Sequence, residues 1–309
     1  MHEKEFGLSR RPFPATPDRA FYYPATAHET ALAELVRAVN DDDGFALLTG
    51  APGTGKTLLA HCLLERLVAD VAVAFLTNSH VSDRVGLLQA ILFDYALPYE
   101  HGGEQVLRLR LTDFLLKNCA AHHRAVLIVD EAQHLSDDLL EELRLLGNLE
   151  AGSGKAFQVI LIAQESLLTA LARPELAAVN QRLAIRPRLE PLGVEESADY
   201  LVHHLRVAGG RPEELFDDTA LEIHARGTHG IPRLLNQAGH QALVIASQAD
   251  MTRVDAEAAL EALDRLGLEA DDSDGEPSTE AKPLLVPAPD AAGEDEGVCR
   301  LFDSPRRPA

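Results

Sequence analysis

The sequence predicts an α/β fold in which a parallel sheet with crossover helices is followed by a purely helical part. Apolar runs of strand length alternate with helical patterns up to residue 192, and this alternation is typical of βαβ crossovers. Beyond residue 192 only helical patterns occur. The third observation is a glycine-rich loop that joins the first apolar run to the helix after it.

Five apolar runs are the candidate strands. Runs this apolar suit strands that are buried on both faces, as in a parallel sheet covered by helices on each side. They are Phe45–Thr49, Val71–Thr77, Ala125–Val129, Gln158–Ala163 and Ala184–Leu189.

Four helices are expected after the last strand, and two capping boxes indicate where helices begin. The boxes are Thr219-x-x-Glu222 and Thr26-x-x-Glu29, and the second opens a helix that runs through Val39. The four helices are expected over Glu195–Val207, Thr219–Arg226, Arg233–Ala249 and Asp255–Leu266.

Residues 269–309 differ in composition from the rest of the chain. They contain 11 acidic and four basic residues, are rich in Pro, Gly and Ser, and show no helical or strand period. Such a segment buries too little apolar surface to fold, so we expect a disordered tail. Its more apolar end, Val298–Pro305, is interpreted as composition alone, with a short partner-binding motif as the alternative.

Charge and composition exclude several classes of protein. A net charge of −21 argues against a surface that binds nucleic acid throughout but leaves room for a local basic groove. No apolar run approaches the ~20 residues of a membrane-spanning helix, and the first twenty residues lack the apolar stretch of a secretory signal. Three cysteines make no disulfide framework, so the cytosol is the expected compartment.

A phosphate-binding loop is the strongest motif. The strand Phe45–Thr49 leads into G-x-x-x-x-G-K-T, and a helix expected over Leu58–Ala69 follows. Glycines let backbone N–H groups surround phosphates, and the helix N-terminus adds a positive dipole end. Lys56 then contacts the β- and γ-phosphates, and the Thr57 hydroxyl binds Mg²⁺. The expected nucleotide-binding residues are Gly50, Ala51, Pro52, Gly53, Thr54, Gly55, Lys56, Thr57 and Leu58.

Two adjacent carboxylates follow the strand Ala125–Val129. Asp130 and Glu131 stand at its carboxyl end, where ligands bind in parallel α/β sheets. Asp130 suits the Mg²⁺ shell, and Glu131 is the natural base that orients or deprotonates an attacking water. The plainer alternative is an acidic first turn of a helix, which Ser136-Asp137-Asp138 supplies better.

Together these motifs resemble those of an AAA+ ATPase in the secretion family typified by the general secretion pathway A (ExeA-type) proteins. The resemblance covers residues 3–266. We expect an α/β AAA+ nucleotide-binding domain at 1–192 and a helical lid at 193–268, followed by the disordered acidic tail at 269–309 that the composition predicts. The matching stretches are Phe6–Leu32, Val129–Gln133, Glu142–Glu150, Gln181–Arg182 and Gly230–Asn236.

The resemblance implies further catalytic roles. Gln164 matches the sensor-1 position, which contacts the attacking water or the γ-phosphate, and Arg233 matches sensor 2. Arg182 is the first candidate, and Arg173 the second, for an arginine finger that serves a neighbouring subunit. The plainer alternatives are a strand-end cap for Gln164, a surface charge for Arg233 and a salt-bridge partner for Arg182.

Weaker expectations concern the surroundings of this site. Asn78 is a candidate switch residue that restrains Glu131. Tyr22, Tyr23 and His28 either line an adenine pocket or only pack together. A histidine pair at 203–204 is expected at or near the surface.

The function implied is Mg²⁺-dependent ATP hydrolysis in a ring or other homo-oligomer. Family members that act on the cell wall carry a transmembrane helix and a periplasmic peptidoglycan-binding region after the lid. The acidic tail stands in their place, so no direct membrane insertion is expected. The expected protein is cytoplasmic or peripheral at the inner membrane through a partner, which belongs to an envelope secretion, pilus or polysaccharide-export machine.

Two alternatives stay open. One is a DNA-binding ATPase of the kind that selects targets in transposition, against which the net charge argues. The other is a slow nucleotide-gated scaffold, against which the Asp130–Glu131 pair argues.

Overall fold

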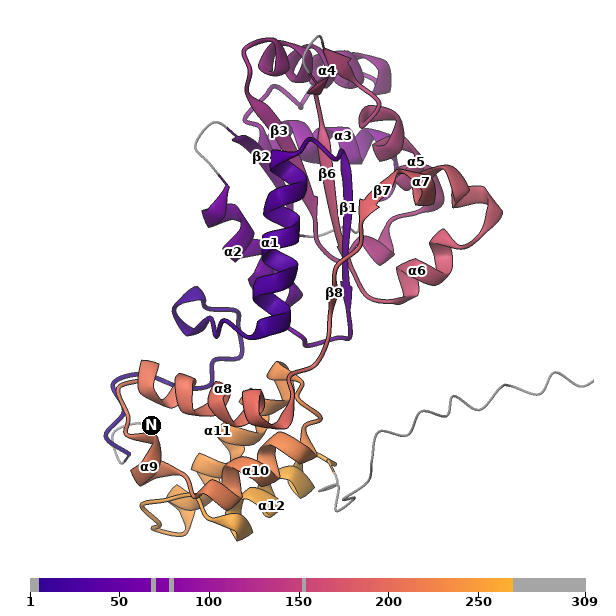
Figure 1. The fold of residues 1–309 in the computed structure, drawn as a ribbon. Helices are drawn as coiled ribbons and strands as arrows, with labels where there is room; N and C mark the ends of the chain where they lie inside the picture. The colour runs from indigo at the N-terminus through magenta and orange to yellow at the C-terminus, as the bar shows by residue number, and fades with distance from the viewer. Residues whose placement is uncertain (1–5, 68–70, 78–80, 152–153, 269–309) are drawn as a thin grey trace, which may run out of the picture. The chain divides into compact units, whose positions relative to one another are not determined.

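A parallel β-sheet organises the first part of the chain (Figure 1). The computed structural model describes residues 6–67, 71–77, 81–151 and 154–268, which belong to one compact unit, Met1–Asp271. The strand order is β2-β3-β6-β1-β7, with β8 also pairing with β1, and every pairing is parallel. The α/β prediction is confirmed, while the predicted acidic tail lies outside the described residues.

The strands bury side chains on both faces, because neighbouring residues of a strand point to opposite sides of the sheet. In β1, Leu47 packs on one face, whereas Ala46 and Leu48 pack on the other. The strands of the sheet are β1 (Phe45–Gly50), β2 (Val71–Leu76), β3 (Arg124–Val129), β6 (Gln158–Ala163), β7 (Leu183–Ile185) and β8 (Arg188–Leu189). A separate antiparallel hairpin consists of β4 (Glu150–Ala151) and β5 (Gly154–Lys155).

Helices cover both faces of the sheet. On one face lie α1 (Thr26–Asn40) and α2 (Lys56–Arg66). The other face packs against α3 (Arg84–Asp94), α4 (Glu104–Ala120), α5 (Asp137–Leu146), α6 (Ser166–Leu171) and α7 (Ala177–Arg182).

Two predicted strands differ from expectation. The fifth, Ala184–Leu189, is divided into β7 and β8, because Pro187 has no N–H to donate to a ladder. Its carbonyl oxygen instead accepts a hydrogen bond from Thr49 N at 3.0 Å. The second strand lies at the sheet edge and is mostly half-buried rather than covered on both faces.

Neither predicted capping box forms. Thr26 is the first residue of α1 instead of the residue before it, and Glu29 accepts a hydrogen bond from the Tyr22 hydroxyl at 2.8 Å. The residue before α10 is Asp217, so Thr219 already lies within the helix. Both helices begin earlier than the boxes predicted, and the threonines occupy the first turn instead of the cap.

A helical part follows residue 192 and recruits the beginning of the chain. Phe13 and Phe21 belong to the same buried cluster as Leu201 and Ala246. The described helices are α8 (Val194–Val207), α9 (Pro212–Leu215), α10 (Asp218–Gly227), α11 (Pro232–Gln248) and α12 (Ala256–Arg265). Four lie close to their predicted bounds, α9 was not predicted, and the domain division at residue 192 stays a prediction. In the described part of the chain, no helix is both long and apolar enough to cross a membrane.

Candidate functional site

The glycine-rich loop connects β1 to α2 through left-handed backbone. Gly53 and Gly55 have φ values of +86° and +96°, which favour glycine because a side chain is strained there. A Cβ atom on Gly53 would also lie 2.9 Å from the Cβ atom of Arg233. The helix begins at Lys56, two residues before the predicted start at Leu58. Glycine is therefore required both for the turn and for the close approach of α11.

Lys56 lies inside this loop. Its side chain is buried, and Nζ donates hydrogen bonds to the carbonyl oxygens of Gly50 and Ala51, each at 2.9 Å. Burial lowers the pKa of Lys56, and the carboxylates of Glu131 and Asp130 oppose that shift. The ammonium is thus held where phosphate oxygens bind in loops of this type.

His28 supports the loop from α1. Its Nε2 atom lies 2.9 Å from the carbonyl oxygen of Thr54, and burial lowers the pKa of the imidazole. Tyr23 packs against Tyr200 and His203. Tyr23 thus packs with aromatic neighbours and His28 contacts the phosphate loop, while the adenine-pocket alternative stays a prediction.

The two predicted carboxylates stand directly after β3. Asp130 is buried, and its Oδ2 accepts a hydrogen bond from Thr57 Oγ1 at 2.6 Å. Its Oδ1 accepts one from the backbone N–H of Glu131 at 2.9 Å. Mg²⁺ prefers oxygen ligands such as carboxylates and hydroxyls, so Asp130 and Thr57 fit the metal predicted there.

Glu131 adopts a left-handed conformation with φ +53°, which is uncommon for a residue with a side chain. Its Oε2 accepts a hydrogen bond from Gln164 Nε2 at 3.4 Å and a shorter one from Gln133 Nε2. Gln133 was not predicted as a site residue. The signal available was its place in the matching stretch Val129–Gln133, but no role was attached to it.

The predicted arginines occupy three different environments. Arg233 is the second residue of α11, and its backbone N–H donates to Gly53 O at 3.2 Å. Arg182 is exposed at the end of α7, next to the edge strand β7. Arg173 donates a hydrogen bond to Asp137 Oδ1 at 2.6 Å. Asn78, the predicted switch residue, lies outside the described residues.

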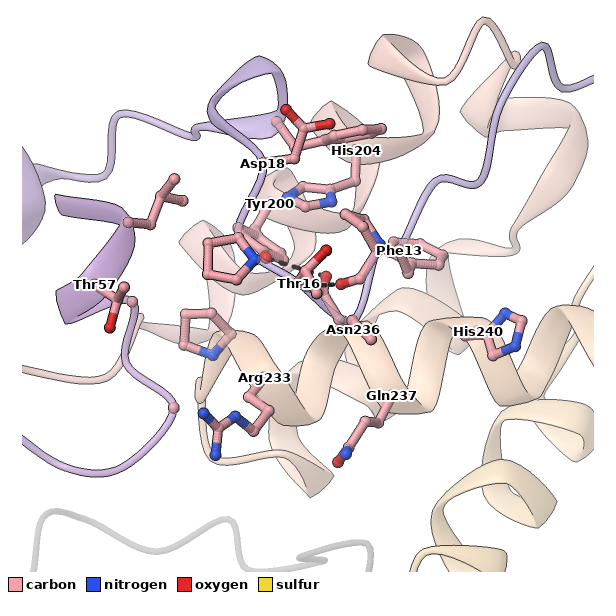
Figure 2. Close-up of a pocket in the computed structure, with 18 of the residues that line it drawn as sticks. Phe13, Thr16, Asp18, Thr57, Tyr200, His204, Arg233, Asn236, Gln237 and His240 are labelled. Atoms are coloured by element: carbon pink, nitrogen blue, oxygen red, sulfur yellow. Dashed lines mark hydrogen bonds between the residues drawn. The ribbon is translucent and has the colours of Figure 1, made fainter. Parts of the chain in front are cut away.

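A pocket of about 640 Å³ brings most of the predicted site residues together, and its size lies within the range of small-molecule sites. On the side of the sheet edge, which we call the sheet side, it is lined by Lys56 and Thr57 at the start of α2 and by Glu131 and Gln164 after β3 and β6, among others. From α11 it is lined by Arg233. Figure 2 shows α11 presenting Arg233, Asn236, Gln237 and His240, with Thr57 across the pocket.

The N-terminal segment closes one side of this pocket. Phe13 and residues 14–18 line it, and Asn236 Nδ2 donates to Pro14 O at 3.4 Å. His204 also lines the pocket, and it is buried, contrary to the predicted surface position. Its ring lies between aromatic neighbours, with centroids 4.1 Å from Tyr200 and 5.0 Å from Phe21.

Several known proteins are similar in sequence to this chain. A family model described as an AAA domain matches residues 39–171. General secretion pathway protein A of Aeromonas hydrophila is 40% identical over 247 residues, which cover 80% of this chain and 45% of that protein. The Holliday junction branch migration complex subunit RuvB of Myxococcus xanthus (strain DK1622) is 27% identical over 82% of this chain and 66% of that protein.

The fold is shared more widely. The structure of the ORC2 protein of Aeropyrum pernix superposes with a TM-score of 0.62 at 16% identity, covering 81% of this chain and 72% of that one. The chain spans less than half the length of the secretion-pathway relative.

Proposed function

Because this chain is an AAA domain protein with the α/β P-loop AAA+ fold, we propose that it binds ATP with Mg²⁺ and hydrolyses it. The observation that supports this most is the meeting of Lys56, Thr57 and Glu131 in one pocket. Each residue serves a different function: Lys56 binds phosphate, Thr57 binds the metal and Glu131 activates water.

The phosphate loop provides ground-state binding. The N–H groups around Gly53 and Gly55 surround the phosphates, and Lys56 neutralises their charge. Thr57 and Asp130 hold Mg²⁺, which supplies further charge neutralisation on the phosphate oxygens. Glu131 orients the attacking water or removes its proton, with Gln164 as a second contact.

Arginine side chains neutralise the remaining charge on the transferred phosphoryl group. Arg233 approaches from α11, whose N-terminus contacts the phosphate loop through Gly53. Arg182 contributes to the site of a neighbouring subunit in a homo-oligomer, where its charge stabilises the transition state.

The cellular role proposed is to energise or regulate an envelope secretion, pilus or polysaccharide-export assembly, with a protein of that machinery as partner. The 40% identity to general secretion pathway protein A supports this role. The protein would act in the cytoplasm or at the inner membrane through that partner.

The test separates binding from chemistry. We expect Lys56→Ala to abolish ATP binding in a calorimetric titration, because the ammonium neutralises phosphate in the ground state. Glu131→Gln should bind ATP but lose about 10²–10⁴ in phosphate release, the usual contribution of a general base. Removing Mg²⁺ with EDTA should stop hydrolysis by the wild type.

Lys117→Ala is the matched control, because Lys117 is exposed on α4 and paired with Asp113. It should leave both binding and hydrolysis unchanged. Wild-type turnover by Glu131→Gln would contradict the assignment of the base.

A second candidate function is a DNA-binding ATPase, which the similarity to a Holliday junction branch migration subunit favours. The net charge of −21 opposes it, since DNA affinity depends on neutralising phosphates with basic residues. We expect no tight duplex binding in fluorescence anisotropy at physiological salt, with or without ATP. Sub-micromolar affinity with a steep salt dependence would make DNA the preferred partner.

A further inference from the structure

Gln133 joins the two strands that carry the proposed chemistry. It lies in the 3₁₀ turn Ala132–His134, directly after Glu131. Its Nε2 donates to Glu131 Oε2, and its Oε1 accepts a hydrogen bond from the backbone N–H of Gln164 at 3.0 Å. One side chain therefore contacts both Glu131, the second residue after β3, and Gln164, the first residue after β6.

The partners determine the orientation of this amide. If the Gln133 amide were rotated by 180°, its NH₂ group would face the N–H of Gln164, and its oxygen would face the carboxylate of Glu131. One donor would then face another donor, and one acceptor would face another acceptor. The Nε2 atom also lies 3.3 Å from Nε2 of His134. The amide is thus held in one orientation by groups of opposite hydrogen-bonding character.

The geometry points to Gln133 as a positioning residue, which holds the Glu131 carboxylate and the Gln164 backbone in a fixed mutual arrangement. This inference rests on the proposed hydrolysis of ATP with Glu131 as the base. A neutral amide donor orients a carboxylate while leaving it anionic, as a base requires. Because β3 and β6 are neighbouring strands, Glu131 and Gln164 lie close together, and the Gln133 side chain that bonds to both fixes their relative positions.

Loss of the hydrogen bonds made by Gln133 should lower kcat and leave the affinity for ATP unchanged. For Gln133→Ala we expect an unchanged calorimetric Kd for ATP and a fall in kcat of about 10–100-fold, because misplacement by ~1 Å can cost about 10² in rate. Gln105→Ala, on the exposed face of α4, is the matched control and should keep the wild-type kcat.

A double variant provides a readout that a merely structural role would not change. The double variant Gln133→Ala with Gln164→Ala should lose less than the product of the two single losses, because both side chains donate to the same oxygen, Glu131 Oε2.

The wild type and Glu131→Gln are assayed in parallel, so that two kinds of failure are distinguishable. Absence of hydrolysis by the wild type, or full hydrolysis by Glu131→Gln, overturns the proposed function and this inference with it. Hydrolysis that requires Glu131 but is unaffected by Gln133→Ala overturns the inference alone. So does a double variant whose losses multiply.

Discussion

The two sides of the pocket are built from different chemistry. On the sheet side, Lys56 and Thr57 are held by loop carbonyls and by Asp130, at distances of 2.6–2.9 Å. On the side of the N-terminal segment and the helices, Phe13 and His204 stack with centroids 5.9 Å apart. The first side is a network of charges and hydrogen bonds, whereas the second is a packed aromatic cluster.

The difference separates function from stability. Charged groups that are held in advance stabilise developing charge without reorganisation, so substitutions on the sheet side should alter catalysis. Aromatic packing contributes mainly through buried area, so substitutions within the aromatic cluster should alter folding and the shape of the pocket. Arg233, on the same side, belongs with the charged groups.

The largest expected effect tests whether the sheet side is complete within one subunit. Leu183 pairs with Phe45 at the start of β1, whereas the phosphate loop follows Gly50 at its end. Five residues at ~3.3 Å each place Arg182 about 16 Å along the strand from its own loop. We therefore expect Arg182→Ala to keep its ATP affinity and lose about 10³–10⁵ in hydrolysis, because the finger serves the next subunit.

Mixing two inactive proteins separates this role from a surface contact. Lys56→Ala protein contributes an intact Arg182 but a site that does not bind ATP, so adding it to Arg182→Ala protein should restore part of the rate. A hydrolysis rate per subunit that does not depend on protein concentration, with Arg182→Ala as active as wild type, would refute both the finger and the assembly.

An intermediate effect is expected on the aromatic side when the pH falls. His204 donates from Nδ1 to the carbonyl oxygen of Pro12 at 2.9 Å. Burial lowers the pKa of His204 to about 4 from 6.5. Between these two values the unfolded chain binds more protons, so the stabilising contribution is complete above pH 6.5 and is lost as the pH falls toward 4.

Chemical denaturation at pH 8 and pH 5 measures this contribution. From pH 8 to pH 5 the wild type should lose ~2 kcal/mol of unfolding free energy more than His204→Phe does. His123→Gln, at an exposed position, is the control and should lose as much as the wild type. Equal losses in His204→Phe and wild type would show that His204 is not neutral in the folded state.

The sequence predicted the sheet side far better than the aromatic side. The phosphate loop and the Asp130–Glu131 pair are contiguous motifs, and each strand of a parallel sheet brings its carboxyl end to the same edge. Gln164, which directly follows β6, was predicted through the family resemblance. Local motifs therefore predict the loop and the carboxylate pair, and the resemblance adds Gln164.

The other half depends on contacts between distant parts of the chain. His204 bonds to Pro12 across 192 positions, and no local pattern reveals such a pairing, so its predicted surface position was wrong. The interruption of the last strand at Pro187 has a different cause, because it follows from a local signal that was overlooked: proline cannot donate to a ladder. The early starts of α1 and α10 differ from the prediction by only one or two residues, the range over which helix ends vary.

The smallest expected effect distinguishes the two candidate fingers. Arg173 and its partner Asp137 are 49% and 44% exposed, and exposed ion pairs contribute only about 0–1 kcal/mol. Arg173→Ala should thus lower the unfolding free energy by no more than ~1 kcal/mol and keep kcat within about threefold of wild type. Phosphate release and chemical denaturation, measured beside Arg182→Ala, check both values. A loss of several orders of magnitude in Arg173→Ala, rescued by mixing with Lys56→Ala protein, would identify Arg173 as the finger instead, since an exposed ion pair within one subunit cannot cause a loss of that size.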